Sequence, residues 1–261
     1  MKMPKRMQDG RAPDTEYIAG LEKGLAVIEA FGQRQSALTV SEASEAVGIS
    51  RAAARRCLLT LQHLGYADYD GKYYRLSPRV LRLGHAYVNS SPLPRFVQPI
   101  IEATSERTQR SMSVAVLDGS DVLVIARALV RRSLSSGLGI GSRLPAYCSA
   151  NGRALLSEWP DSDIQRLLKQ APIRRLTAYT KTGASDILKE IRAVRGRGYA
   201  LNDQEVEIGV RTIAVPIHSR SGQIAASLSM SAPPDGSDDA GNLVTLLPEI
   251  DAARSRIEAL L

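Results

Sequence analysis

The sequence predicts an α+β protein with two domains, an N-terminal winged helix-turn-helix and a C-terminal domain with helices on an antiparallel sheet. Three observations support this prediction. The chain has 261 residues, more than one hydrophobic core usually supports. A Ser/Pro-rich stretch at 90–94 indicates a linker. Short amphipathic helices and a hairpin precede that stretch, whereas helices and paired strands follow it.

The composition is that of an ordinary globular protein with a basic balance. Hydrophobic residues make up 44% of the chain, the formal net charge is +7 and the pI is about 9.6, which favours an anionic partner. No apolar run approaches the roughly 18 residues of a membrane span. The basic, polar segment 1–14 lacks the apolar core of a signal peptide. We therefore expect a cytoplasmic protein with no membrane partner.

The cysteines and histidines form no metal or disulfide pattern. Cys57 and Cys148 are far apart, and the three histidines are scattered along the chain. We expect reduced thiols, no metal and no cofactor, with Cys57 as a small core residue.

Local signals place the first three helices. The first covers 21–31, where apolar residues recur every three or four positions. The apolar residues of this amphipathic helix are Leu21, Leu25, Ile28 and Phe31. A second helix begins after Thr39, which fits a capping box with Glu42, and ends at Gly48. A third helix follows, with Ser50 as its cap.

A hairpin completes the N-terminal pattern. The third helix ends at Gly65, and the alternating segment 66–76 turns at Asp70-Gly71. Another helix is predicted over 78–89. Two short helices that meet at a glycine, followed by a hairpin, are typical of a winged helix-turn-helix.

The third helix carries the residues that would face DNA. At roughly 100° per residue, its apolar side chains share one face and its arginines lie opposite. The predicted core face consists of Ala54, Cys57, Leu58, Leu61 and Leu64. Arginine suits guanine edges and phosphate oxygens, and the helix N-terminus can bind a phosphate. The residues expected at DNA are Thr39, Ser50, Arg51, Ala52, Arg55, Arg56, Lys72 and Tyr73, with Arg75 beside them on the hairpin. The alternative is a solvated basic face on an ordinary helix bundle.

The second part mixes helices and strands. Helices are predicted over 95–109, 149–158, 161–170, 185–197 and 243–261. Strands are predicted over 112–117, 122–129, 212–218 and 223–231. Gly119-Ser120 and Ser221-Gly222 separate the two strand pairs as hairpin turns, so one antiparallel sheet is expected.

Enzyme motifs are missing from the sequence. There is no G-x-S-x-G, H-E-x-x-H or P-loop. The glycines at 137–141 resemble part of a nucleotide loop, but Pro145 follows and no helix starts at the last glycine. The alternating acids Asp203, Glu205 and Glu207 are expected to be solvated or at an interface. We do not expect an enzyme; a ligand sensor that acts only through protein partners is the other alternative.

Three segments resemble the IclR family of bacterial transcription regulators. They are YIAGLEKGLAVIEAF (17–31), LTVSEASEAVGISRAAARRCLLTLQHLGY (38–66) and EIGVRTIAVPIHSRSGQIAASLSMSAP (207–233). The third is similar to the family's C-terminal signature and is the most specific. YIAGLEKGL and GSRLPAYCSANGRALL (141–156) are similar to the branch that regulates aromatic-acid catabolism through the β-ketoadipate pathway, the PcaR/PobR/PcaU type.

The resemblance implies that DNA binding and effector binding belong to different domains of the chain. It implies a winged helix-turn-helix over 17–77, a linker helix over 78–93 and a GAF/PAS-like effector domain over 94–261, and we expect 1–16 to be a disordered arm. It also implies binding to double-stranded operator or promoter DNA, dimers through the N-terminal domains or tetramers, and contact with RNA polymerase if the protein activates. The implied function is a ligand-responsive regulator of aromatic-acid catabolism; the alternative is another catabolic operon with a different small-acid effector.

The effector site is expected where a helix and two strands carry small polar residues. The N-terminus of the helix over 149–158 can bind a carboxylate, with Ser149 as a further donor. Ser229 and Ser231 face the same side of a strand beside Thr212, and buried hydroxyls need a partner or a ligand. By resemblance, the pocket positions are Leu144, Ser149, Ala150, Asn151, Asn202, Thr212, Ser229 and Ser231. The alternative is that the serines merely pair across strands and that Asn151 is an ordinary first-turn residue.

The expected effector is a small organic acid, either an aromatic carboxylate or a β-ketoadipate-like acid. In the branch that this chain resembles, a methionine often precedes the glycine matching Gly152, whereas this chain has Asn151, which favours a different effector. Arg127, Arg131 and Arg132 could neutralise an acid, although a solvated face is the favoured interpretation for them.

Overall fold

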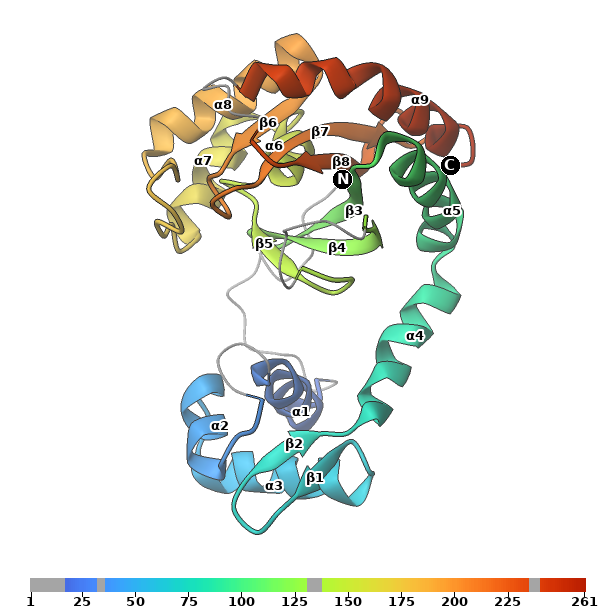
Figure 1. Cartoon of the computed structure of the whole chain (residues 1–261). Coiled ribbons are helices and arrows are strands. Elements are labelled where there is room, and N and C mark those ends of the chain that lie inside the picture. The colour runs from blue at the N-terminus through green and yellow to red at the C-terminus, as the bar shows by residue number, and fades with distance from the viewer. Residues whose placement is uncertain (1–16, 32–35, 131–137, 235–239) are drawn as a thin grey trace. The chain divides into compact units, whose positions relative to one another are not determined.

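The computed structural model describes residues 17–31, 36–130, 138–234 and 240–261. The predicted arm at 1–16, together with Arg131, Arg132 and Gly137, lies outside these residues. The described chain divides into two compact units at Ser91 (Figure 1). Within the described residues no helix is both long and apolar enough to cross a membrane.

The N-terminal unit begins with three helices, α1 (Ala19–Ala30), α2 (Val40–Val47) and α3 (Arg51–His63). The capping box predicted at the start of α2 is present. The Thr39 N–H donates to Glu42 Oε2 at 2.7 Å, and the Glu42 N–H donates to Thr39 Oγ1 at 3.3 Å. Gly48 ends α2 with φ 72°, a left-handed conformation that glycine adopts without a steric penalty.

A two-stranded wing follows α3. Strands β1 (Ala67–Tyr69) and β2 (Tyr74–Leu76) pair antiparallel, as the Asp70-Gly71 turn predicts. Leu38 adds a bridge to Tyr74, whose N–H and C=O both bond to it at 2.8 and 2.9 Å. The wing is therefore held to the chain ahead of α2.

The apolar face that identifies α1 is buried only in part. Leu21 is 60% and Leu25 48% exposed, whereas Val27 and Ala30 are the buried residues of the helix. Periodicity identifies an apolar face of the helix. It does not show whether this face packs against the rest of the chain or stays exposed, because the pattern is the same in both cases.

The two units meet in sequence at a break between helices. A 3₁₀ turn (Pro78–Val80) and α4 (Leu81–Ser90) occupy most of the segment predicted as a linker helix. Ser91 is extended, with φ −100° and ψ 122°, because Pro92 follows and disfavours a helical residue before it. Pro92 then starts α5 (Pro92–Thr108).

The C-terminal unit is built on a six-stranded antiparallel sheet in the order β5-β4-β3-β8-β7-β6. Its strands are β3 (Ser111–Asp118), β4 (Asp121–Ala128), β5 (Arg143–Pro145), β6 (Ala200–Asp203), β7 (Arg211–His218) and β8 (Ile224–Ala232). The four predicted strands are confirmed and form its centre. The short edge strands β5 and β6 are additional, since three or four residues carry little periodic signal.

Helices cover both faces of this sheet. On one face lie α5 and α9 (Leu247–Glu258); on the other lie α6 (Ala150–Leu156), α7 (Asp161–Gln170) and α8 (Ala184–Arg197) (Figure 1). The last predicted helix begins later than expected, because Pro248 lies in the first turn of α9 and a 3₁₀ segment precedes it. The α+β prediction is confirmed.

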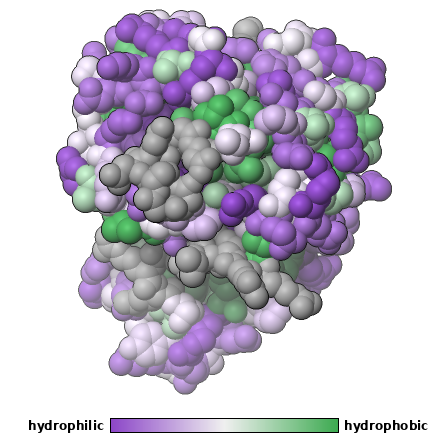
Figure 2. All heavy atoms as spheres, turned by 45° about the horizontal axis from the view of Figure 1, so that its top comes forward, coloured by the Kyte–Doolittle hydropathy of each residue, from purple (hydrophilic) through white to green (hydrophobic). Residues whose placement is uncertain are grey.

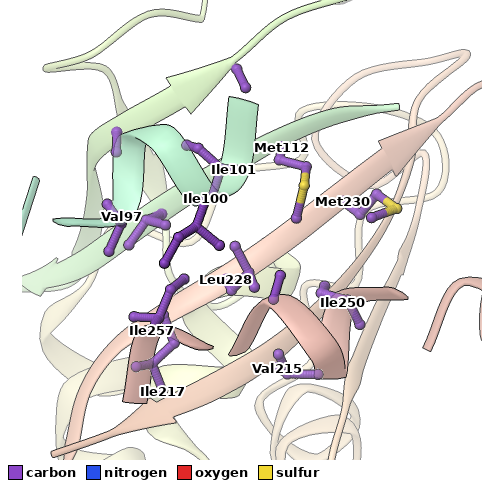
Figure 3. Packing of buried hydrophobic residues seen from close by; sticks show 14 of the residues in the cluster. Val97, Ile100, Ile101, Met112, Val215, Ile217, Leu228, Met230, Ile250 and Ile257 are labelled. Atoms are coloured by element: carbon purple, nitrogen blue, oxygen red, sulfur yellow. The ribbon is translucent and has the colours of Figure 1, made fainter. Parts of the chain in front are cut away.

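The larger core lies between the sheet and the α5/α9 pair. Figure 3 shows Ile100 and Ile257 from the two helices among Leu228 and Met230 of β8. A second core joins α6, α7 and α8 to the other face. In the space-filling view, hydrophilic side chains cover most of the visible surface and hydrophobic areas are smaller (Figure 2). The α6 side of the sheet carries the polar residues described next.

Candidate functional site

Helix α3 presents the basic face that the sequence predicts. Arg51, Ala52, Arg55 and Arg56 are exposed, while Ala53, Ala54, Leu58 and Leu61 are buried. None of the three arginines forms an ion pair within the part of the chain that the structure describes. Arg56 lies nearer α1, in an open groove with Lys23 and Thr60. The helix therefore exposes guanidinium groups that are available to an anionic partner.

The caps of α2 and α3 use the hydroxyls of Thr39 and Ser50. Ser50 Oγ accepts from the Ala53 N–H at 3.3 Å, and Thr39 Oγ1 is part of the capping box. Each hydroxyl keeps its proton for a phosphate oxygen. Leu64, which was predicted in the core face, is 49% exposed, because it lies beyond the last turn of α3.

Asp70 orders the wing. Its Oδ1 accepts from the N–H groups of Tyr73 at 2.8 Å and Lys72 at 3.0 Å, and its Oδ2 pairs with Arg75 at 2.5 Å. The Tyr73 backbone hydrogen bond, the Arg75 side chain and the Lys72 backbone lower the pKa of Asp70 to about 2. The Lys72 ammonium lies 4.9 Å from the Tyr73 ring centroid. Lys72 thus remains the cation of the wing for an outside partner, whereas Arg75 has an internal one.

A pocket opens on the α6 side of the sheet, and all eight residues predicted for the effector line it. These are Leu144, Ser149, Ala150, Asn151, Asn202, Thr212, Ser229 and Ser231. The remaining described lining residues are Ser111, Met112, Ser113, Val124, Arg127, Leu138, Val206, Glu207 and Val210. The cavity volume is about 60 Å³, so the pocket suits a small molecule.

Hydroxyl and amide groups cross the floor of the pocket in a row. Strand register aligns Ser111 with Ser231, Ser231 with Thr212, and Thr212 with Asn202. Thr212 Oγ1 and Ser231 Oγ lie 3.1 Å apart. The two serines predicted from their spacing of two share a face and line the pocket, and both also pair with other groups. That they bind an effector stays a prediction.

Asn151 joins α6 to the sheet. Its Nδ2 donates to Ser229 Oγ at 3.0 Å, and its Oδ1 accepts from Ser227 Oγ at 2.9 Å. Ser229 Oγ also lies 2.8 Å from Ser113 Oγ. Asn151 is buried, so it is a structural part of the pocket wall and not an ordinary first-turn residue.

The start of α6 is more closely packed than the sequence indicated. Ser149 Oγ accepts from the Gly152 N–H at 3.1 Å, and α6 has only seven residues, which weakens its dipole. A Cβ on Gly152 would lie 2.2 Å from the Ala146 carbonyl oxygen. Glycine is therefore required for the close approach of α6 to the preceding chain.

Arg127 and Glu207 are the charged residues among the described lining. The solvated position favoured for Arg127 is wrong, because β4 directs its half-buried side chain to the pocket. Desolvation lowers the pKa of Arg127, and the negative charge of Glu207 raises it. The two charges thus act on one another at the pocket.

The three alternating acids have three different environments. Asp203 pairs with Arg211 at 2.8 Å, Glu207 lines the pocket, and Glu205 is buried with Arg153. The expectation that these acids are solvated or at an interface is wrong for Glu205, which is buried because the segment between β6 and β7 packs against Arg153 of α6. Acids at every second position do not reveal such burial from sequence alone.

Some pocket residues could have been predicted and others could not. Ser111 and Ser113 show the same spacing of two as Ser229 and Ser231, so the same argument would have found them. Val206, Glu207 and Val210 come from an irregular segment without periodicity. Gly139 and Gly141 precede the short strand β5 and no helix, unlike the glycines of a dinucleotide loop. No metal-binding group of three His, Cys, Asp or Glu side chains occurs among the described residues.

Family profiles match both units. The profile described as "Bacterial transcriptional regulator IclR C-terminal" matches residues 85–258, and "IclR helix-turn-helix domain" matches 20–71. A "Pca regulon regulatory protein" of Pseudomonas putida is 43% identical over 219 residues, which are 84% of this chain and 75% of that protein.

Solved structures of similar proteins support the same family assignment. A transcriptional regulator from Rhodococcus sp. RHA1 is 39% identical with a TM-score of 0.77, covering 93% of this chain and 98% of that one. A double mutant of the PobR inducer-binding domain from Acinetobacter, in complex with 3-hydroxybenzoic acid, is 27% identical with a TM-score of 0.60. It covers 66% of this chain and 100% of that one. The resemblance is confirmed: this chain belongs to the IclR family of bacterial transcriptional regulators.

Proposed function

We propose that this protein regulates transcription by binding DNA through α3 and the wing. Exposed Arg51, Arg55 and Arg56 would contact base edges and phosphates in the major groove, with Ala52 allowing close approach. Thr39 and Ser50 would hold phosphates at the two helix starts, and Lys72 and Tyr73 would contact the backbone from the wing. In this scheme residues 17–77 bind DNA, residues 78–93 connect the two domains, and residues 94–261 bind the effector.

We further propose that the pocket binds a small organic acid and that this acid is linked to aromatic-acid catabolism. The observation that carries this proposal is the convergence of the eight predicted residues on one pocket, together with the half-buried guanidinium of Arg127. Hydroxyl and amide donors beside an arginine suit a carboxylate. The printed names of the relatives, a Pca regulon regulator and a hydroxybenzoic-acid complex, support an aromatic carboxylate or a β-ketoadipate-like acid.

The acid would act by shifting an equilibrium between two arrangements of the chain. A dimer or tetramer would place two winged helices on two half-sites, with RNA polymerase as a further partner if the protein activates. Only an acid with different affinity for the two arrangements can change DNA binding. The partner classes are thus operator DNA, the acid and a second copy of the chain.

A thermal-shift panel tests the sensing part of this proposal. It contains 4-hydroxybenzoate, protocatechuate, β-ketoadipate, pyruvate and glyoxylate, each with the full chain. An acid at about 100 times its Kd adds roughly 2.7 kcal/mol of stability, which gives a measurable rise in Tm. A rise with an aromatic acid or β-ketoadipate supports the assignment. A panel without any shift would contradict the aromatic-acid assignment and leave the DNA-binding part to a separate operator-binding experiment.

A further inference from the structure

A chain of hydrogen bonds runs from the interior of the C-terminal unit to the wall of the pocket. It begins at Ser227 of β8, passes through Asn151 of α6 to Ser229 of β8, and ends at Ser113 of β3. The first three residues are 0%, 4% and 1% exposed, whereas Ser113 is half-buried and lines the pocket. Ser113 is not among the eight positions predicted for the effector.

The amide of Asn151 lies between two hydroxyls, and its two ends differ in what they can do. The carbonyl oxygen only accepts hydrogen bonds, and the NH₂ group only donates them. Ser227 Oγ lies 2.9 Å from Asn151 Oδ1 and 3.3 Å from the Ala115 carbonyl oxygen. With Oδ1 towards Ser227, the proton of this serine has the nearer acceptor, and Asn151 Nδ2 donates to Ser229 Oγ at 3.0 Å. The reversed amide would leave that proton only the longer contact.

The N–H of Asn151 decides where the proton of Ser229 goes. A hydroxyl has one proton, and Ser229 cannot give it to Asn151 Nδ2, which is itself a donor. The two other acceptors in contact with Ser229 Oγ within the described residues both belong to Ser113, Oγ at 2.8 Å and the carbonyl oxygen at 3.4 Å. The shorter contact makes Ser229 the donor to Ser113 Oγ. The proton of Ser113 then has no acceptor in the part of the chain that the structure describes.

We propose that Asn151 orients this chain of hydroxyls so that Ser113 donates a hydrogen bond to a carboxylate oxygen of the effector. Ser113 is thereby a further binding residue, and Asn151 is a positioning residue that acts through Ser229. A hydrogen bond to an ionised acceptor is roughly twice as strong as one between neutral groups, so this single donor affects affinity measurably. The inference rests on the proposed function, since it requires the pocket to be the effector site.

Calorimetric titration of the full chain with 4-hydroxybenzoate, protocatechuate and β-ketoadipate tests the binding role of Ser113. Each variant is titrated with the acid that the wild type binds most tightly. Ser113→Ala is expected to weaken the binding of that acid at least tenfold. The control is Ser221→Ala, which removes an exposed hydroxyl from the β7–β8 turn and does not line the pocket. It should leave the affinity unchanged.

A double-mutant cycle tests the positioning role of Asn151. Asn151→Leu removes the donor to Ser229, so the proton of Ser113 can turn to Ser229 Oγ and away from the acid. The change is expected to weaken binding at least fivefold in the wild-type background and less than twofold in the Ser113→Ala background. Asn151→Ala removes the same donor without added bulk, and it replaces Asn151→Leu if Trp159 fluorescence shows a lowered unfolding midpoint for the latter.

Two results would overturn the inference alone, with acid binding still weakened by Ser229→Ala together with Ser231→Ala. One is an unchanged affinity in Ser113→Ala. The other is an equal loss on changing Asn151 in both backgrounds, which would mean that Asn151 acts on the acid without Ser113. If no acid binds, or if binding survives the double serine change, the pocket is not the effector site. The proposed sensing function then fails, and the inference with it.

Discussion

Arg153 on α6 and Glu205 in the segment before β7 form a two-bond ion pair inside the C-terminal unit. Nη1 lies 2.6 Å from Oε1 and Nη2 2.8 Å from Oε2, and the two residues are 0% and 3% exposed. Arg153 Nε and Nη1 also donate to the carbonyls of Tyr147 and Leu201. Because Val206 and Glu207 follow Glu205 directly, this pair holds one wall of the pocket against α6.

Arg153→Met is expected to lower the free energy of unfolding by about 3–5 kcal/mol, since the buried Glu205 carboxylate loses its guanidinium partner and keeps, among the described residues, only the Lys181 N–H at 3.0 Å and Nζ at 3.9 Å. Urea unfolding followed by Trp159, the single tryptophan, reports on the C-terminal unit. Arg166→Met, which breaks an exposed pair with Asp163, should cost about 0–1 kcal/mol. Equal losses in the two variants would mean that burial does not set the contribution of the pair.

Gly152→Ala is expected to destabilise the C-terminal unit by about 1–3 kcal/mol or more, because the new methyl group would overlap the Ala146 backbone. The matched control is Gly196→Ala on α8, where nothing lies within 4 Å of the new Cβ. That change should stabilise by about 0.5–1 kcal/mol through helix propensity. Two substitutions of the same kind should thus shift the thermal midpoint in opposite directions, and shifts of the same sign would refute the packing argument.

Arg55→Ala is expected to cost roughly 1–3 kcal/mol of operator binding while effector affinity stays unchanged. Fluorescence anisotropy with DNA fragments selected from the genome by the wild-type protein measures the first quantity, and calorimetry measures the second. Arg256→Ala removes the same charge from an exposed position on α9 and should change operator affinity much less. Unaltered operator affinity in Arg55→Ala would remove this residue from the reading face.

Ser229→Ala combined with Ser231→Ala is expected to weaken effector binding and to spare DNA binding without effector. The double change removes the hydroxyls that face Asn151 and Thr212, and each polar group left without a partner costs about 1–3 kcal/mol. Ser219→Ala with Ser221→Ala, in the β7–β8 turn, is the matched control. Wild-type acid affinity in the first pair would exclude these hydroxyls from the binding site.

The Asp70 carboxyl is expected to titrate near pH 2, as its pKa of about 2 requires. A lowered pKa means that the ionised form stabilises the wing above the ordinary value of 3.8, and that this contribution is lost as the pH falls through about 2. Carbon NMR of the side-chain carboxyl measures the midpoint. Arg75→Ala should raise it, and a wild-type midpoint near 3.8 would show that the turn hydrogen bonds do not form in solution.

The predictable part of the fold consists of features that a few neighbouring residues determine. The Thr39–Glu42 capping box, the left-handed Gly48 and the Asp70-Gly71 turn each depend on hydrogen bonds or φ angles within about four residues. The central strands were predictable for the same reason, since alternation and turn glycines are local. Of the eight pocket positions, local chemistry pointed to Ser149, Thr212, Ser229 and Ser231, whereas Leu144, Ala150, Asn151 and Asn202 came from the family resemblance alone.

The sequence by itself determined the helix-turn-helix, the wing, the central strands and the basic face of α3, because hydrogen bonding and periodicity along the chain define them. Only the tertiary structure decided that Leu21 and Leu25 are exposed, that Glu205 is buried with Arg153, and that Arg127 and Glu207 share a pocket. These outcomes depend on which distant segments pack together. Burial and charge pairing are properties of that packing, and residues about 50 to 80 positions apart leave no periodic trace of it in the sequence.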